Sequence, residues 1–140
     1  MKRRLAGVVF ADTSYFYALL DPGDVNHADA RRLAEEMADQ QLTVATTLPV
    51  IYETVTLLRY RAGHRAARRF VETLLPALRV VEVGAERHAQ ALALFLRLGR
   101  DTRLSLCDAL SFLVVREDLG DVPCLAFDRD FRRLGLQLLV

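Results

Sequence analysis

The stretch VVFAD, at residues 8–12, decides the fold class of this 140-residue chain. Four apolar residues in a row indicate a strand that is buried on both faces, as the inner strands of parallel sheets are. The run ends at Asp12, and Thr13 or Ser14 can cap a short apolar helix that continues through residue 20. A buried strand that leads directly into a helix is typical of α/β proteins.

The same alternation continues to the end of the chain. Further strands are predicted at residues 42–45, 79–83 and 122–127, with a possible fifth at 136–139. Helices are predicted at residues 13–20, 25–40, 47–61, 64–75, 85–98, 104–118 and 129–134. This order predicts one domain over residues 1–140, with a mostly parallel central sheet of four to five strands and helices on both faces.

Composition excludes several classes of protein. The chain is 52% hydrophobic, and its 19 basic and 18 acidic residues give a net charge of +1, so it is neither disordered nor strongly basic. Cys107 and Cys124 lie 17 residues apart, in no metal-ligand spacing, and are interpreted as buried thiols in a reducing compartment. No apolar run approaches the ~18 residues that a membrane span needs, so no membrane partner is expected.

The beginning of the chain resembles a secretory signal only superficially. A basic segment at residues 2–4, which includes Lys2, the only lysine, precedes apolar residues 5–11. That run is short and ends at Asp12 without a small-residue cleavage site. We therefore expect a basic lead-in to the first strand and a cytoplasmic protein.

Four acidic residues stand in positions that invite a functional interpretation. Asp12 and Asp128 each follow a predicted strand, although an aspartate there can also serve simply as a helix N-cap. Asp108 lies on a narrow polar stripe of an otherwise apolar helix, where an unpaired carboxylate would need an arginine or a metal ion. Glu53 has apolar neighbours on both sides, although it could also be an exposed glutamate that pairs with an arginine.

A single site would explain all four acids together. Carboxylates gathered within ~4–6 Å of one another drive each other toward protonation unless a cation is present. Mg²⁺ and Mn²⁺ prefer carboxylate oxygens and water, and they support the hydrolysis of phosphodiester bonds. The acids therefore predict a metal-dependent hydrolase of this kind.

At these residues the sequence resembles the PIN-domain ribonucleases, most closely the toxin subunits of VapBC toxin–antitoxin systems. The match covers essentially the whole chain in order. The matching segments are DTS at residues 12–14, DVNHADA at 24–30, YETVTLL at 52–58, LSLCDA at 104–109 and DRDF at 128–131. Each motif alone is weak, whereas the ordered set is specific.

The resemblance implies an endoribonuclease toxin with an acidic Mg²⁺ or Mn²⁺ site. Asp12 and Asp108 would be the direct metal ligands, with Glu53 and Asp128 completing the catalytic site and Ser14 supporting it. The family often has threonine two residues before its last acid, where this chain has Ala126, so Asp130 is a possible substitute for Asp128.

The resemblance further implies an RNA substrate, a homodimer, and a cognate antitoxin whose C-terminal segment covers the acidic site. The alternative is a catalytically degenerate PIN-like module that binds RNA or protein. Other acid-bearing α/β classes lack their motifs: receivers need a late lysine, and haloacid-dehalogenase-type phosphatases open with Asp-x-Asp-x-Thr.

An arginine-rich segment offers a candidate contact for RNA. No acid lies between Glu53 and Glu72, whereas Arg65, Arg68 and Arg69 share one helix face there. Arginine binds phosphates bidentately and stacks on unpaired bases, which suits single-stranded or looped RNA. The same surface could instead be simply solvated, or face the antitoxin or a second subunit.

Overall fold

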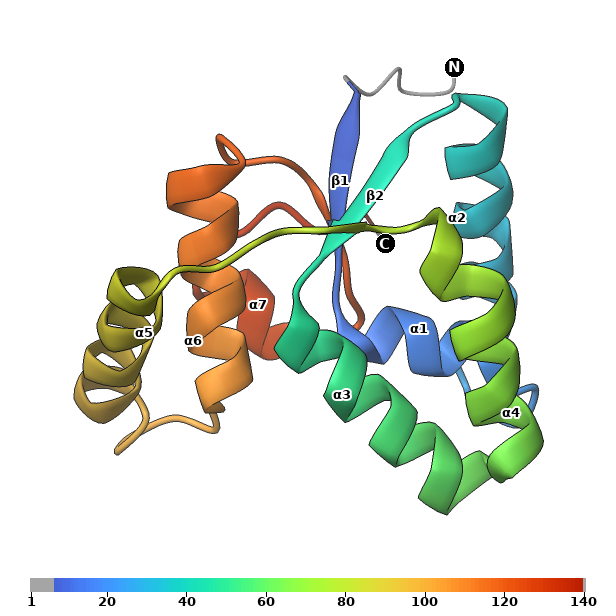
Figure 1. Ribbon diagram of the computed structural model, residues 1–140, viewed down its shortest axis with the longest axis horizontal. Helices are drawn as coiled ribbons and strands as arrows, with labels where there is room; N and C mark the ends of the chain where they lie inside the picture. The colour runs from blue at the N-terminus through green and yellow to red at the C-terminus, as the bar shows by residue number, and fades with distance from the viewer. Residues whose placement is uncertain (1–6, 140) are drawn as a thin grey trace.

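A parallel four-stranded sheet forms the centre of the computed structural model, which describes residues 7–139 (Figure 1). The strands are β1 (Val8–Ala11), β2 (Thr43–Thr46), β3 (Arg79–Val80) and β4 (Cys124–Leu125), in the order β3-β2-β1-β4. Within the sheet Val9 pairs with Val44, and Phe10 pairs with Cys124. The basic lead-in predicted at residues 2–4 lies outside the described residues.

Helices cover the sheet on both sides, which confirms the predicted α/β class (Figure 1). The described α-helices are α1 (Thr13–Leu20), α2 (His27–Asp39), α3 (Leu48–Leu57), α4 (His64–Arg69), α5 (Ala85–Leu98), α6 (Leu106–Leu113) and α7 (Arg129–Arg133). The group α1 to α4 lies on one side of the strands and the group α5 to α7 on the other. The sequence prediction gives both ends of α5 correctly.

Three helices widen into π-helical turns near their C-terminal ends. These turns are Leu58–Ala62, Phe70–Leu74 and Val114–Asp118, and a 3₁₀ turn, Leu75–Ala77, follows the second. The first residue of each π turn is completely buried. Widening lets that side chain stay in the core while the helix ends, a local adjustment that hydrophobic spacing alone does not reveal.

The strands near the edges are shorter than the sequence predicts. β3 ends at Val80 instead of residue 83, and β4 covers only two of the residues predicted at 122–127. Pro123, directly before β4, has no N–H to donate to a neighbouring strand. The fifth strand predicted at 136–139 is reduced to one parallel bridge between Leu138 and Cys124.

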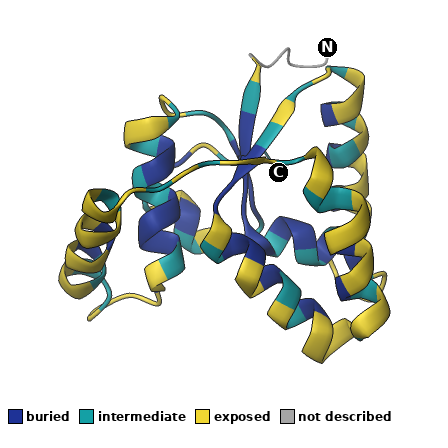
Figure 2. Ribbon diagram, viewed as in Figure 1, coloured by how far each residue is buried: buried dark blue, intermediate teal, exposed yellow. Residues whose placement is uncertain are grey.

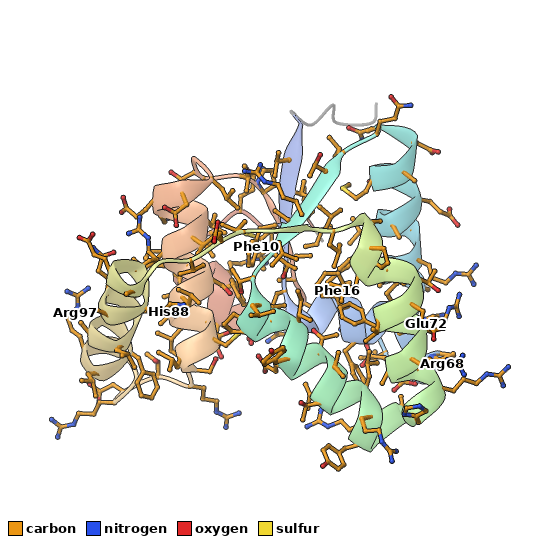
Figure 3. All side chains as sticks on the ribbon, in the orientation of Figure 1. Phe10, Phe16, Arg68, Glu72, His88 and Arg97 are labelled. Carbon is orange, nitrogen blue, oxygen red and sulfur yellow. The ribbon has the colours of Figure 1, made fainter. Side chains whose placement is uncertain are left out.

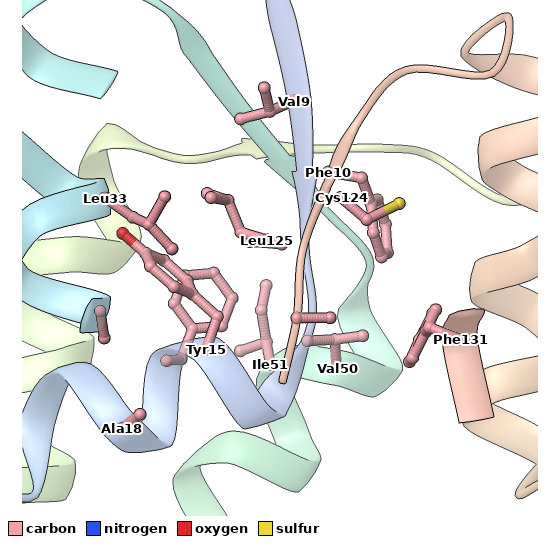
Figure 4. Packing of buried hydrophobic residues seen from close by; sticks show 14 of the residues in the cluster. Val9, Phe10, Tyr15, Ala18, Leu33, Val50, Ile51, Cys124, Leu125 and Phe131 are labelled. Carbon is pink, nitrogen blue, oxygen red and sulfur yellow. The ribbon is translucent and has the colours of Figure 1, made fainter. Parts of the chain in front are cut away.

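The core lies where the helices meet the sheet (Figure 2). Leu125 of β4 lies close to Tyr15 of α1 and Ile51 of α3, in one buried cluster that also includes Val9 of β1 (Figure 4). Helix α6 buries Ala109, as its apolar sequence predicts. The described helices are all too short or too polar to cross a membrane. The core fixes the beginnings of α1, α3 and α6 around the carboxyl ends of β1 and β4.

Candidate active site

A polar pocket of about 490 Å³ opens at the carboxyl ends of the strands. Open parallel sheets bind their ligands at this edge. The four acids singled out in the sequence all line the pocket, each from a different segment: Asp12 from the end of β1, Glu53 from α3, Asp108 from α6 and Asp128 from the segment after β4. Residues that are distant in the sequence therefore share one cavity.

Asp12 is the most buried of these acids and also caps α1. Only 4% of its surface is exposed, and its Oδ2 accepts hydrogen bonds from the backbone N–H of Ser14 at 3.2 Å and from the Ser14 hydroxyl at 2.9 Å. Burial raises the pKa of Asp12 to about 7, and the nearby Asp108 adds to this rise, while the bonds from Ser14 oppose it. The predicted cap at Thr13 or Ser14 is wrong, because the cap is Asp12 itself.

Ser14 links the two loops that carry Asp12 and Asp128. Its hydroxyl donates to Asp12 and accepts a hydrogen bond from the backbone N–H of Phe127 at 3.0 Å. Phe127 directly precedes Asp128 in the sequence. Ser14, predicted to support the acids, thus contacts both Asp12 and the segment that carries Asp128.

Asp108 is held by a reciprocal cap at the beginning of α6. Its Oδ2 accepts from the backbone N–H of Ser105 at 3.1 Å, and Ser105 Oγ accepts from the backbone N–H of Asp108 at 3.0 Å. Helix α6 therefore begins at Leu106, not at residue 104 as predicted. Burial raises the pKa of Asp108, against these bonds, and the negative charges of Asp128 and Glu53 raise it further.

Glu53 differs from the other acids because it is exposed and caps no helix. The neighbouring Cys107 is half-buried; burial raises the pKa of its thiol, and a hydrogen bond to Glu53 adds to this. Asp128 caps α7 by accepting from the backbone N–H of Asp130 at 2.9 Å. Asp130 does not line the pocket and instead lies 3.7 Å from Arg133.

The oxygen-rich donor set fits a divalent ion that keeps most of its waters. Within residues 7–139, no three His, Cys, Asp or Glu side chains are grouped closely enough to hold one ion together. Mg²⁺ usually takes only one or two carboxylates directly, together with water. The buried pair Asp12 and Asp108 meets that requirement. Burial and nearby negative charges raise the pKa of both carboxyl groups, and a bound cation would stabilise their ionised forms.

The predicted basic face lies apart from this pocket. Arg65, Arg68 and Arg69 are exposed on α4, and none of them lines the acidic cavity. Arg68 is paired with Glu72 at 2.8 Å, one helical turn later (Figure 3). This pairing reduces the free positive charge of the face.

The pocket also contains residues that the sequence analysis did not assign to it. They are Thr13, Tyr17, Asp24, Asn26, Leu57, Arg61, Arg103, Ser105 and Phe127. Asn26 belongs to a family motif, and Arg61 to the acid-free arginine segment, so both carried a signal in the sequence. Asp24 also belongs to that family motif, whereas Arg103 carried no signal, because only the fold brings its loop to the pocket.

These features are those of a PIN domain. The chain belongs to the PIN-domain family, whose sequence model matches residues 9–136. The chain is 39% identical over 130 residues to the 23S rRNA-specific endonuclease VapC20 of Mycobacterium tuberculosis, covering 91% of this chain and 95% of that protein. These comparisons confirm the family indicated by the sequence.

Solved structures show the same fold. The crystal structure of Mycobacterium tuberculosis VapC20, described as a sarcin–ricin loop cleaving toxin, superposes with a TM-score of 0.79 at 36% identity, over 91% of this chain and 95% of that one. VapBC2 from Rickettsia felis, solved on a promoter DNA fragment, gives a TM-score of 0.67 at 15% identity, over 94% of this chain and 97% of that one. The second similarity concerns the fold alone.

Proposed function

We propose that this protein is an endoribonuclease, the toxin component of a type II toxin–antitoxin system, which hydrolyses RNA phosphodiester bonds with Mg²⁺ or Mn²⁺. The observation that carries the proposal is the meeting of Asp12, Glu53, Asp108 and Asp128 in one pocket at the carboxyl edge of the sheet. The kinship with VapC20, a ribosomal RNA endonuclease, supports RNA as the substrate.

Asp12 and Asp108 would hold the ion directly, and Glu53 and Asp128 would act on it through water. A bound Mg²⁺ or Mn²⁺ would supply charge stabilisation at the scissile phosphate and a more acidic attacking water. The protein's own contribution is orientation: the bonds from Ser14 and Ser105 fix the carboxylates of Asp12 and Asp108 before substrate arrives. These hydrogen bonds also favour the ionised forms of Asp12 and Asp108, because they lower the pKa of each carboxyl group.

The metal proposal is tested by cleavage of a 23S rRNA fragment that contains the sarcin–ricin loop, the target named for VapC20. We expect cleavage with Mg²⁺ or Mn²⁺ and none with EDTA. Asp108→Asn should abolish cleavage while the protein stays folded, because asparagine keeps the side-chain size. The matched control is Asp39→Asn, an exposed aspartate outside the pocket, which should cleave like wild type.

Cleavage that persists in EDTA, or full activity of Asp108→Asn, would contradict the metal mechanism. Metal-independent binding of this RNA without any cleavage would favour the alternative, a degenerate PIN-like binding module. A second RNA with a scrambled loop distinguishes a loop-specific enzyme from a general ribonuclease.

We further propose that a cognate antitoxin regulates the enzyme in the cytoplasm by covering the acidic pocket. The kinship with a toxin supports this partner. Because the pocket combines five carboxylates with only two arginines, a basic antitoxin segment would complement it. Co-purification of a small protein with the native chain, and loss of cleavage on its addition, would test the proposal.

A homodimer is the third part of this proposal. An apolar groove of about 640 Å³ runs between α3, β3 and α5, and its lining includes Leu48, Tyr52 and Val80. A smaller apolar pocket of about 350 Å³ adjoins it and reaches Leu92 and Leu106. A second copy of the chain would remove this surface from water.

A further inference from the structure

Two arginines line the acidic pocket without being neutralised there. Arg61 and Arg103 are both exposed, and within the described residues neither guanidinium makes an ion pair or a hydrogen bond. Five other arginines form ion pairs with acids: Arg32, Arg68, Arg87, Arg116 and Arg133. The guanidinium groups of Arg61 and Arg103 are therefore free to bind an anionic ligand that enters the pocket.

Arg61 lines the pocket from the end of α3, where the helix widens into a π-helical turn. Glu53, Leu57 and Arg61 all line the pocket, at intervals of four residues. In a regular α-helix eight residues turn about 80° beyond two full turns, so Arg61 would lie toward the edge of the face that carries Glu53. The π-helical turn Leu58–Ala62 takes more residues per turn and so turns Arg61 back toward Glu53, about 12 Å along the helix.

Arg103 reaches the pocket from the opposite wall, on the loop between α5 and α6. The hydroxyl of Thr102 holds this loop: it donates to the carbonyl of Leu98 at 2.8 Å and accepts from the backbone N–H of Leu104 at 3.2 Å. Leu104 itself is buried in the core. Arg103 therefore stands on a fixed segment, two residues before the cap of Asp108.

We propose that Arg61 and Arg103 form a phosphate clamp, in which each guanidinium binds an RNA phosphate on one side of the scissile bond. This proposal rests on the nuclease function proposed above. A single strand crossing the pocket would pass one arginine, then the acids, then the other arginine. Guanidinium binds phosphate bidentately, so the two contacts set where the strand lies over the carboxylates.

The clamp also explains how a pocket with more acids than arginines accepts a polyanion. Five carboxylates repel RNA, and metal ions at the acids compensate only the centre of the pocket. Positive charge is then needed where the flanking phosphates lie. Arg61 and Arg103 are positioning residues in this arrangement, since they contact phosphates that do not react.

Binding is measured separately from cleavage in the Asp108→Asn background, with EDTA present. The probe is a labelled 23S rRNA fragment carrying the sarcin–ricin loop, with Kd determined by fluorescence anisotropy over a range of KCl concentrations. Arg61→Gln and Arg103→Gln are compared with Arg97→Gln, an exposed arginine of α5 outside the pocket (Figure 3). Arg103→Lys restores the charge without the planar fork.

Each pocket variant should weaken binding about tenfold at low salt, as expected for a lost charged hydrogen bond. The slope of log Kd against log salt should fall by about 0.7 for each lost phosphate contact. Arg103→Lys should keep the slope, and Arg97→Gln should match the parent. In the active protein Arg61→Gln should raise KM more than it lowers kcat.

An unchanged salt slope in Arg61→Gln and Arg103→Gln would overturn the clamp, and so would equal weakening by Arg97→Gln. Faster cleavage by either glutamine variant would also overturn it, since the arginine would then be blocking the acids. Cleavage by the wild-type chain reports on the proposed nuclease independently. RNA binding without cleavage would refute the nuclease and, with it, a clamp around a scissile bond, whereas an active wild-type chain whose glutamine variants keep the salt slope would refute the clamp alone.

Discussion

Ser14 and Phe127 lie 113 residues apart in the sequence and are joined by a 3.0 Å hydrogen bond from the Phe127 backbone N–H to the Ser14 hydroxyl. The same hydroxyl donates to Asp12. One side chain therefore fixes the spacing between the end of β1 and the segment that carries Asp128.

Ser14→Ala should lower both stability and cleavage. The change leaves the Phe127 N–H and one bond of Asp12 unsatisfied, which should cost about 2 kcal/mol in the free energy of unfolding by urea. The control is Ser111→Ala, because the buried hydroxyl of Ser111 has no hydrogen-bond partner among the described residues. Its loss should be neutral or stabilising. Equal destabilisation by both changes would contradict a bridging role for Ser14.

Asp12→Asn should abolish cleavage and make the metal-free protein more stable above pH 7. Burial raises the folded pKa of Asp12 from 3.8 to about 7, so the folded state holds a proton that the unfolded state has released. Stability from this group is therefore full below the unfolded pKa and is lost as pH rises through 7. The free energy of unfolding should fall by about 4 kcal/mol in total over this pH range.

The measurement is urea unfolding of wild type and Asp12→Asn with EDTA across this pH range. The advantage of the variant should shrink toward zero near pH 4, where both chains are neutral at this position. An advantage that does not depend on pH would mean that titration of Asp12 is not its cause.

Mg²⁺ should stabilise the wild-type chain but not Asp12→Asn or Asp108→Asn. Binding to the folded state alone raises stability by about 2.7 kcal/mol at a hundredfold excess over Kd. Thermal unfolding with increasing Mg²⁺ measures the effect, with Asp39→Asn as the control. Equal stabilisation of all four proteins would place the ion outside this pocket.

Leu92→Glu should convert the proposed homodimer into a monomer. Leu92 is 51% exposed and lines the apolar pocket beside α6, so a charge there would be buried between subunits. Sedimentation velocity at micromolar concentration measures the outcome. The control is Val25→Glu, at an exposed residue of the loop before α2. A monomeric wild type would contradict the dimer itself.

RNA binding by the basic face of α4 remains a prediction, and the structure shows that one of its three arginines is paired with an acid. Neutralising Arg65, Arg68 and Arg69 together should weaken RNA binding and reduce the salt slope by up to ~0.7 for each lost phosphate contact. Arg68→Gln alone should have the smallest effect, because Glu72 already pairs with it. An unchanged slope in the triple variant would favour a partner-binding surface instead.

The sequence predicts those features that local patterns determine. The apolar run before Asp12 identifies β1, and the spacing in residues 85–98 gives α5 correctly. The cap of α6 could have been anticipated, because Ser105 and Asp108 have capping-box spacing. Local patterns do not reveal the short β3, since its length depends on pairing with β2. They also cannot place Arg103 opposite Arg61.

Three of the four predicted catalytic acids perform a second task, since Asp12, Asp108 and Asp128 each accept backbone hydrogen bonds at the beginning of a helix. A descendant that no longer cleaved RNA would still be selected to keep these aspartates for folding. Their survival in an alignment is therefore a poor marker of activity. Glu53 caps nothing and is exposed, so it would be the first acid to drift after catalysis is lost.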